Sequence, residues 1–362
     1  MEFELIRQYF EEPFACFNAK HGHTLLRGIG DDCAQLRIPD GHTLYVSSDT
    51  SVQGVHFFPD DPPQAISAKA LATNLSDLAA CGAQPLGFSL NLTLPAPCTE
   101  STWMQSFSSG LYQLASAHDC PLVGGDTTRG PCLAVSITVY GHAPKAHHGF
   151  HRSLAQVGQD LWVSGVPGLA RLGMLCAYQA RDRLNELYPQ VDHLLQIRAL
   201  LDGLGPQARA LALGAFESPL PRIQLGTALR PLASACMDLS DGLSGDLGHI
   251  VAQSGVALHL QSEDLLSSWG NIRQHVNKLE PSVILALALE GGDDYELCFT
   301  AWPHHRGEIA QVSKNLQIPL QRVGTVHAGR GVFMHDAAGL QRPVPPVSYN
   351  HLANPHHTGE ST

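Results

Sequence analysis

A hydrophobic segment long enough to cross a bilayer is missing from this sequence of 362 residues, because its longest apolar run of note, at 283–289, falls well short of the ~20 residues required. The N-terminus also lacks the basic-then-apolar pattern of a signal peptide. Nine cysteines are scattered singly with no CxxC pair, which indicates reduced thiols and not a disulfide framework. These absences predict a cytoplasmic protein with no membrane partner.

Basic residues are also scarce. The 22 Lys and Arg residues stand against 33 Asp and Glu, which gives a formal net charge of −11 at pH 7. A broad nucleic-acid surface would need clustered Lys and Arg, so no nucleic-acid partner is expected. Phosphorylated small molecules remain compatible with this charge, because metal ions can mediate their contact with carboxylates.

The common nucleotide-binding and catalytic signatures are absent as well. There is no GxxxxGK[ST] loop, and the segment GIGDDC at 28–33 lacks the third glycine of GxGxxG. Neither a GxSxG elbow nor a kinase catalytic loop occurs in the chain. If ATP binds to this protein, it binds in another way.

What the sequence does contain is an alternation of strands and helices. Apolar residues recur at every second position over 87–94 and 133–139, which predicts half-buried strands, and at helical spacing over 64–81 and 101–117. A polar stretch rich in Gly, His and Pro after Gly141 predicts a domain boundary. Beyond it, we expect strands over 160–164, 235–238, 256–260 and 296–300 and a helix over 243–254.

Strands with one apolar and one polar face are typical of sheets that are open to solvent or to a partner on one side. The sequence therefore predicts an α+β (α/β two-domain) fold. Residues 1–145 would form the N-terminal domain, residues 146–350 a C-terminal α/β domain, and residues 351–362 a flexible tail.

Aspartates in Gly- and Ser-rich turns are the most informative residues. Each turn follows an apolar segment or closes a helix: GIGDDC (28–33), SSDT (47–50), NLSD (74–77), GGDTTRG (124–130), MDLSDG (237–242) and GGDDYE (291–296). Taken singly, such an Asp is more often structural, because its side chain satisfies local backbone N–H groups. Six such motifs in one chain favour a functional interpretation.

Several carboxylates brought together cannot all stay ionised without cations. Mg²⁺ supplies this compensation, since it binds a few carboxylates together with water and substrate phosphates. Glycine beside an Asp lets the backbone approach a ligand closely, and GGD offers unhindered N–H groups to phosphate oxygens. The expected ligand is a complex of metal ions with a polyphosphate.

The ordered series of motifs resembles the thiamine-monophosphate kinase family, over nearly the whole chain from about residue 3 to residue 352. The matching segments are GIGDDC, SSDTSVQGVHF, KALATNLSDLAACGAQP, GGDTTRG, MDLSDGLSGDLGHI and GGDDYELCFT. This family shares a superfamily with aminoimidazole ribonucleotide synthetase and selenophosphate synthetase. The resemblance implies two α/β domains, a homodimer formed through the N-terminal mixed sheets, and several Mg²⁺ ions. It also implies transfer of the γ-phosphoryl group from ATP, the co-substrate, to thiamine phosphate.

The resemblance also implies site residues, carried over by motif position. The implied magnesium positions are Asp32, Ser47, Ser48, Asp49, Asp77, Asp126, Asp238 and Asp241. The implied ATP contacts are Gly124, Gly125, Arg152 and Ser240, and the implied substrate contacts are His56, Asp293 and Tyr349. At Asp293 this chain departs from the family, because most members carry the longer Glu there.

Structural interpretations stand beside several of these assignments. Ser47 and Ser48 could simply terminate a strand, and His56 could be a core histidine with satisfied hydrogen bonds. Arg152 could be an exposed linker residue, and Tyr349 could be ordinary packing in the C-terminal stretch. The aspartates of SSDT, NLSD, GGD and MDLSD, taken as a set, are the positions for which a functional role is most strongly indicated.

The implied chemistry needs no general base, and we name no catalytic base. A phosphate monoester has a second pKa near ~6, so its oxygen is already largely deprotonated at neutral pH. Catalysis would then consist of positioning and charge neutralisation in one direct in-line step.

Three alternatives stay open at this point. Selenophosphate synthetase would want a reactive Cys in a Gly-rich loop, whereas Cys16 lies in an apolar FACF segment. The hydrogenase-maturation relative would end with a functional Cys, whereas this sequence ends in GEST. A catalytically silent dimer that binds nucleotide or divalent ions is the third, and retention of all the acidic motifs argues against it.

Overall fold

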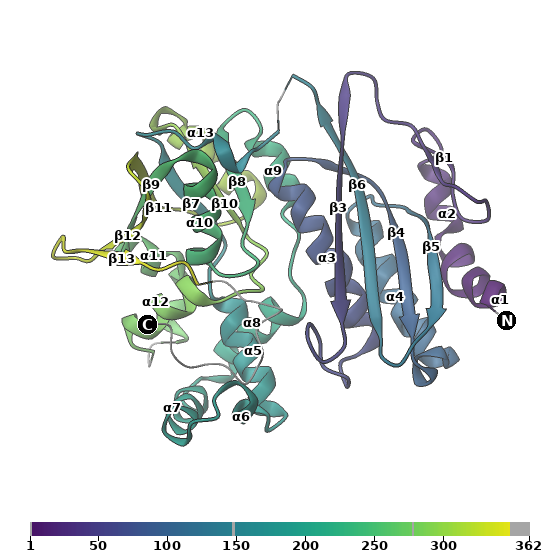
Figure 1. The fold of residues 1–362 in the computed structure, drawn as a ribbon, viewed down its shortest axis with the longest axis horizontal. Coiled ribbons are helices and arrows are strands. Elements are labelled where there is room, and N and C mark those ends of the chain that lie inside the picture. The colour runs from purple at the N-terminus through teal and green to yellow at the C-terminus, as the bar shows by residue number, and fades with distance from the viewer. Residues whose placement is uncertain (1, 147–148, 277–278, 348–362) are drawn as a thin grey trace.

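A computed structural model describes residues 2–146, 149–276 and 279–347 and contains two mixed helix-and-sheet domains (Figure 1). The N-terminal domain begins with helical segments and a short β-hairpin and continues with a larger sheet. Its elements are α1 (Glu2–Ile6), a π-helical turn (Arg7–Glu11), α2 (Glu12–Lys20), β1 (Leu25–Arg27), β2 (Gln35–Leu36), β3 (His42–Val52), α3 (Pro63–Ala80), β4 (Gln84–Leu94), α4 (Ser101–Ala117), β5 (Leu122–Arg129) and β6 (Ala134–Pro144).

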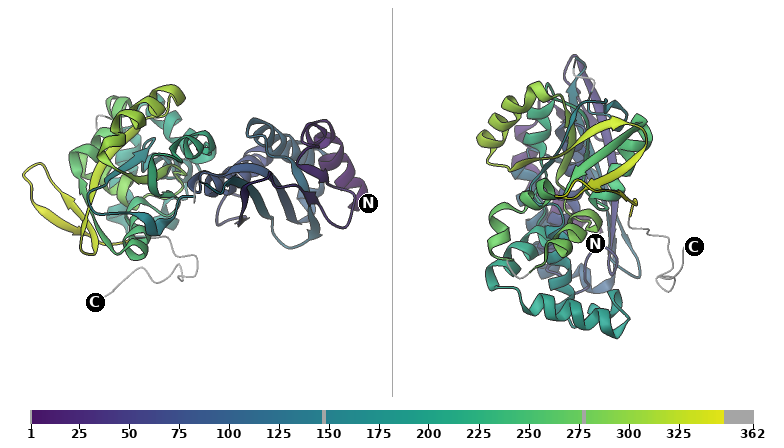
Figure 2. Two further views of the ribbon diagram at one scale, coloured as in Figure 1. Left: turned by 90° about the horizontal axis from the view of Figure 1, so that it is seen from above. Right: turned by 90° about the vertical axis from the view of Figure 1, so that its left-hand side faces the viewer.

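The larger N-terminal sheet is mixed and has the order β3-β6-β4-β5. β6 pairs antiparallel with β3 and β4, whereas β4 and β5 run parallel. Val135, Ile137 and Val139 of β6 are buried against α3 and α4, and the residues between them face the other side. Both helices lie on one face, so the opposite face is open, as the alternating pattern predicts (Figure 2).

The C-terminal domain surrounds a sheet with the order β13-β12-β9-β11-β7-β10-β8. Its elements are β7 (Asp160–Ser164), α5 (Leu169–Ala180), α6 (Leu184–Leu187), α7 (Val191–Asp202), α8 (Pro206–Glu217), α9 (Ile223–Leu229), β8 (Ala233–Asp238), α10 (Leu243–Ser254), β9 (Val256–Gln261), α11 (Ser262–Ser268), α12 (Pro281–Glu290), β10 (Leu297–Ala301), α13 (Arg306–Leu316), β11 (Leu320–Ala328), β12 (Gly331–His335) and β13 (Gln341–Val344).

One apolar cluster crosses from the first domain into the second. It contains Leu75 and Phe88 of the N-terminal domain together with Leu225 and Phe299 of the C-terminal domain. The backbones approach closely where α9 packs on α3, because a Cβ at Gly226 would stand 2.1 Å from the carbonyl oxygen of Ala79. Helix α3 therefore belongs to the core of both domains, and it is the element that holds the two halves of the site together.

The expected elements agree closely with the structure. Helices α4 and α10 and strand β7 have the predicted bounds, because strong apolar periodicity and clear breakers marked them. The predicted mixed N-terminal sheet and α/β C-terminal domain are confirmed. Strand β6 continues to Pro144, three residues beyond Gly141, after which the polar stretch was expected to begin. Across the described ranges, no helix has both the length and the apolar character needed to cross a membrane.

Candidate functional site

The site lies at the junction of the domains, where α3 presents polar side chains to both. Asp77, on the last turn of α3, accepts a hydrogen bond of 2.5 Å from the hydroxyl of Ser47 on the edge strand β3. The strand alternation turns Ser47 toward α3 and Ser48 toward the open face, where Ser48 bonds with Thr138 of β6. Of the two predicted serines, the structure therefore brings the side chain of Ser47 to Asp77.

Asp238 is the contribution of the second domain. It is the last residue of β8 and is buried, and its Oδ2 accepts a hydrogen bond of 2.8 Å from the hydroxyl of Ser76 on α3. Leu239, the next residue, is buried in the apolar core of the second domain. Ser76 thus holds the carboxylate of the second domain, and its neighbour Asp77 is the carboxylate of the first domain.

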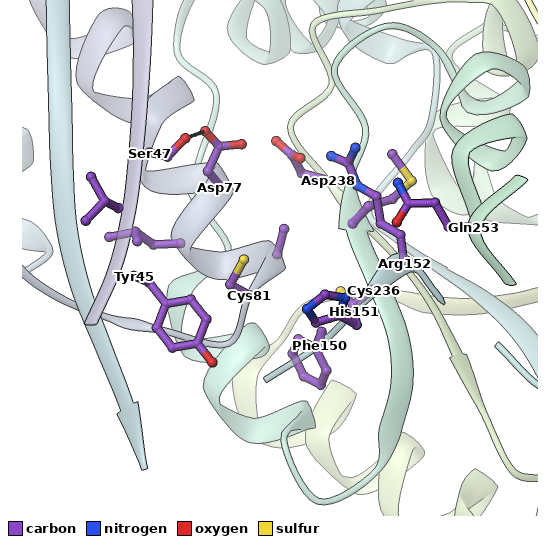
Figure 3. Close-up of a pocket in the computed structure, with 14 residues that line it drawn as sticks. Tyr45, Ser47, Asp77, Cys81, Phe150, His151, Arg152, Cys236, Asp238 and Gln253 are labelled. Atoms are coloured by element: carbon purple, nitrogen blue, oxygen red, sulfur yellow. Dashed lines mark hydrogen bonds between the residues drawn. The ribbon is translucent and has the colours of Figure 1, made fainter. Parts of the chain in front are cut away.

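A cavity of about 330 Å³ opens beside these two carboxylates. In Figure 3, Asp77, Asp238 and the guanidinium of Arg152 point toward one another. Arg152 is held in place because Ser254, at the end of α10, donates a hydrogen bond of 2.7 Å to its carbonyl oxygen. The other lining residues are Tyr45, Val46, Ser47, Leu78, Ala80, Cys81, Phe150, His151, Cys236, Met237 and Gln253.

Burial raises the pKa values of both carboxyl groups in this cavity. Desolvation raises the pKa of Asp77 to about 7, and the nearby charge of Asp238 adds to the effect. Desolvation likewise raises the pKa of Asp238, whereas its bond from Ser76 and the charge of Arg152 oppose the shift. Two carboxyl groups that resist ionisation together are poised to gain a cation.

Asp49 and His56 extend the site along β3 and the loop after it. The backbone N–H of Asp49 donates to the amide oxygen of Asn74 on α3, at 3.1 Å. Desolvation raises the pKa of Asp49 although its side chain is accessible to solvent, and the nearby His56 opposes the shift. The ring of His56 accepts a hydrogen bond from the backbone N–H of Val52, at 3.0 Å, which fixes the turn that carries it.

The MDLSDG turn is shaped by a residue that sequence reasoning missed, Asp246. This buried carboxylate of α10 accepts hydrogen bonds from the backbone N–H groups of Ser240 and Asp241, at 3.1 and 3.3 Å. Desolvation raises its pKa to about 7, with added contributions from Asp238 and Asp241, so these carboxyl groups are neighbours. The sequence did hold a signal for Asp246, because it is an acidic residue in the first turn of a predicted helix. Such a residue can accept hydrogen bonds from the N–H groups that precede the helix.

The GGDDYE loop divides its acidic residues among three tasks. Asp294 accepts hydrogen bonds from the N–H groups of Gly168 and Ala170 and so caps α5. Glu296 forms a bidentate ion pair with Arg222. The backbone N–H of Asp293 donates to the carbonyl oxygen of Ser240, at 2.8 Å, and ties this residue to the MDLSDG turn.

Four other predicted positions lie away from this cavity. Asp32 is exposed in the segment between β1 and β2, and Asp126 is exposed on β5. Gly124 and Gly125 precede Asp126 on β5, which is separated from β3 by two intervening strands. A Cβ at Gly125 would stand 1.8 Å from the carbonyl oxygen of Leu90, whereas a Cβ at Gly124 would meet nothing within 4 Å. Gly125 is thus required by strand packing, and Gly124 leaves open space for a ligand.

Tyr349, the remaining predicted substrate contact, lies outside the described residues. Among those residues, no group of three or more His, Cys, Asp and Glu side chains is placed to hold a metal ion by itself. The pair Asp77 and Asp238 nevertheless suits a hard divalent ion that keeps several waters, because such an ion needs only one or two carboxylates with substrate phosphates as its other ligands. The arrangement can hold a metal-bound phosphate group beside the cation of Arg152.

Comparisons with known proteins agree over most of the chain. Residues 30–143 match the family model described as AIR synthase related protein, N-terminal domain. The sequence is 39% identical over 362 residues to the thiamine-monophosphate kinase of Salmonella typhimurium. The alignment covers 98% of this chain and 99% of that protein. The structure is similar to thiamine-monophosphate kinase from Stenotrophomonas maltophilia K279a, with a TM-score of 0.76, 36% identity and coverage of 89% and 94% of the two chains. AaThiL complexed with AMPPCP and TMP is also similar, with a TM-score of 0.69, 26% identity and coverage of 96% and 98%.

Proposed function

The chain belongs to the thiamine-monophosphate kinase family, and from this premise we propose that it transfers the γ-phosphoryl group of ATP to thiamine phosphate, giving thiamine diphosphate. Its relatives are kinases, and AaThiL has been solved with AMPPCP and TMP bound. The observation in this chain that carries the proposal is the convergence of Asp77, Asp238 and Arg152 on one cavity between the domains.

Magnesium is part of the proposal because the carboxylates of the site have only the single positive charge of Arg152 among the residues that line the cavity with them. Burial raises the pKa values of Asp77 and Asp238, and nearby carboxylates add to both shifts, which is the response expected of carboxyl groups arranged for a divalent cation. Asp49, Asp77 and Asp238 would hold such ions, and the ions would neutralise charge on the triphosphate. The further ligands Asp32, Ser47, Ser48, Asp126 and Asp241 remain predictions from the resemblance.

The chain's own residues would bind and orient the two anions. Arg152 would donate to phosphate oxygens, since its guanidinium lies beside the two central carboxylates. His56 and Asp293 would contact thiamine phosphate, whose phosphate oxygen is the nucleophile and needs no base to remove a proton. The rate would then come from alignment of donor and acceptor for one in-line step. The ATP contacts Gly124, Gly125 and Ser240 and the substrate contact Tyr349 are proposed on the same resemblance.

A homodimer through the N-terminal sheets would explain why part of the acidic set lies elsewhere. β3 and β5 are the two outer strands of the sheet, and the face between them is open. If two copies associate through this face with a two-fold axis along the strands, β5 of one copy meets β3 of the other. Asp126 of one chain would then serve the site of its partner.

A cytoplasmic location is also proposed, because the scattered and unpaired cysteines are typical of a reducing compartment.

The deciding experiment compares acceptors with the purified full chain. ATP turnover should be measured with Mg²⁺ and thiamine phosphate, free thiamine or an aminoimidazole precursor, with ADP release coupled to NADH oxidation. Thiamine phosphate should react and free thiamine should not, because its hydroxyl has no base to activate it. Comparable turnover of free thiamine, or turnover of the aminoimidazole precursor alone, would sink the proposal.

A further inference from the structure

One ion pair at the domain junction has no place in the site described so far. Lys69, on α3, lies with its Nζ 3.2 Å from Oδ2 of Asp293, which is 224 positions further along the chain. The ammonium also stands 3.8 Å from the ring centroid of Phe216 on α8. Only 13% of the Lys69 side chain and 35% of the Asp293 side chain are exposed. The ammonium of Lys69 is therefore largely shielded from water and has one carboxylate, that of Asp293, as its ion-pair partner.

Asp293 is held in an unusual conformation for this contact. Its φ of 67° lies in the left-handed region, which a residue with a Cβ adopts only when its surroundings compensate the strain. The compensation comes from the bond of its N–H to Ser240 and from the hydroxyl of Tyr295, which donates to Oδ1 at 3.3 Å. Both carboxylate oxygens thus have partners, Tyr295 on one and Lys69 on the other. These contacts fix both the backbone and the carboxylate of Asp293.

Lys69 also shares a helix with the groups that hold the central carboxylates. Ser76 and Asp77 follow it by seven and eight residues, which is two helical turns, or about 10 Å along the axis. Ser76 and Lys69 both reach across the junction, the first to Asp238 and the second to Asp293. The same helix therefore connects the proposed phosphate-transfer centre with Asp293, the proposed contact of the acceptor.

We propose that Lys69 is the residue that selects a phosphorylated acceptor, by exchanging its partner when the acceptor binds. The inference rests on the proposed function, in which Asp293 contacts thiamine phosphate. That molecule carries a thiazolium cation and a phosphate anion. A cationic ring that binds at Asp293 displaces the ammonium of Lys69, and a partly buried ammonium without an anion is costly. The phosphate of the same molecule supplies the replacement, so one ion pair is exchanged for two.

Free thiamine offers only half of this exchange. It brings the cation that displaces Lys69 and no anion to receive it, so its binding leaves the ammonium unpaired. The pair Lys69–Asp293 would thus favour the phosphorylated form before any chemistry occurs. A purely structural Lys69, one that only ties α3 to the second domain, would make no distinction between the two ligands.

The test compares the affinities of thiamine phosphate and of thiamine for wild-type protein and for Lys69→Met, by titration calorimetry on the full chain with Mg²⁺. Methionine keeps the apolar stem over Phe216 and removes the charge. The ratio of the two affinities, which measures the preference for thiamine phosphate over thiamine, should fall about tenfold or more, chiefly because thiamine binding no longer leaves an ammonium unpaired. In turnover assays, kcat and KM for ATP should change little. Lys69→Arg should recover part of the lost preference.

Lys314→Met serves as the matched control, because Lys314 is exposed on α13. It should change neither affinity. Should Lys69→Met fail to fold, Lys69→Gln is tested with the same two ligands. Equal losses for both ligands, or a lower melting temperature with unchanged affinities, would overturn the role of Lys69 alone. A wild-type protein that binds neither ligand would overturn the proposed function as well.

Discussion

The two outer strands of the N-terminal sheet carry similar residues in very different surroundings. On β3, Ser47 is bonded to Asp77, and the second domain lies alongside with Asp238. Strand β5, which carries Gly124 and Asp126, lies at the other edge of the sheet, on the side away from the C-terminal domain (Figure 1). The structure thus brings the acidic residues on the β3 side to the second domain and leaves Asp126 on β5 apart from them. The proposed dimer would account for this separation.

The largest effect is expected from the β3 side, with Asp238→Asn. Asparagine can still accept the hydrogen bond from Ser76 and fill the same volume, but it lacks the charge that would hold Mg²⁺. Turnover should fall ~100-fold or more, on the order of 3 kcal/mol of transition-state stabilisation, while the melting temperature without ligand stays near that of the wild type. Steady-state kinetics and a thermal melt check this. Full activity, or a large melting shift, would make Asp238 a structural residue. The same outcome is predicted for Asp241→Asn.

Asp126→Asn tests the other edge and should cost at least about tenfold in turnover. If β5 completes the site of a partner chain, mixing this variant with Asp238→Asn should restore activity, because each mixed dimer contains one intact site. Equal mixing and subunit exchange would recover roughly a quarter of wild-type activity. Recovery that depends on subunit exchange supports the shared site. Absence of any recovery, with mixed dimers confirmed by mass spectrometry, would place all the acidic residues of one site on one chain.

The paired glycines of β5 separate packing from ligand contact. Gly125→Ala should destabilise the protein by roughly 2–4 kcal/mol, because the new Cβ would overlap the carbonyl oxygen of Leu90. Gly124→Ala should leave the melting temperature unchanged and raise KM for ATP several-fold, since its Cβ would enter open space that the phosphates are proposed to occupy. Chemical denaturation and ATP saturation curves distinguish the two. Normal ATP binding by Gly124→Ala would remove this glycine from the proposed site.

The smallest effect concerns pH and Asp77. Its pKa is about 7 in the folded protein against an ordinary value of 3.8, so the folded state holds the proton more tightly. The stability that this proton provides is present below about pH 4 and is lost as pH rises toward 7. In EDTA, Asp77→Asn should therefore narrow the difference in melting temperature between pH 5 and pH 7.5 by a few degrees. Mg²⁺ should stabilise the wild type at pH 7.5. Identical pH profiles for wild type and Asp77→Asn would contradict the raised pKa of Asp77.

Much of the fold could be read from periodicity alone. The apolar repeat fixed the bounds of α4 and α10, and period-two alternation identified β4 and β6 as strands with one open face. The same alternation could have separated Ser47 from Ser48, because neighbouring strand residues must point to opposite faces. The resemblance treated both as ligands, and it takes the strand geometry to see that their side chains diverge.

Contacts between distant segments could not be predicted in this way. Asp294, Glu296 and Asp293 look alike in the sequence, yet one caps α5, one pairs with Arg222 and one pairs with Lys69. Which role each residue takes depends on its tertiary contacts, since the start of α5 contacts Asp294 and Arg222, just before α9, contacts Glu296. The pair of Lys69 and Asp293 has the same character, since neither local propensity nor spacing connects residues in two domains.

The core that α3 shares between the domains has a consequence for biosynthesis. Residues 1–145 leave the ribosome before α9 and β10 exist, although Leu75 of α3 packs in one cluster with Leu225 and Phe299. At ordinary rates of elongation, this apolar face waits on the order of 10 s for its covering segments. A nascent chain in that interval is a natural client for a chaperone, and a fragment that stops at residue 145 would carry the exposed face permanently and aggregate.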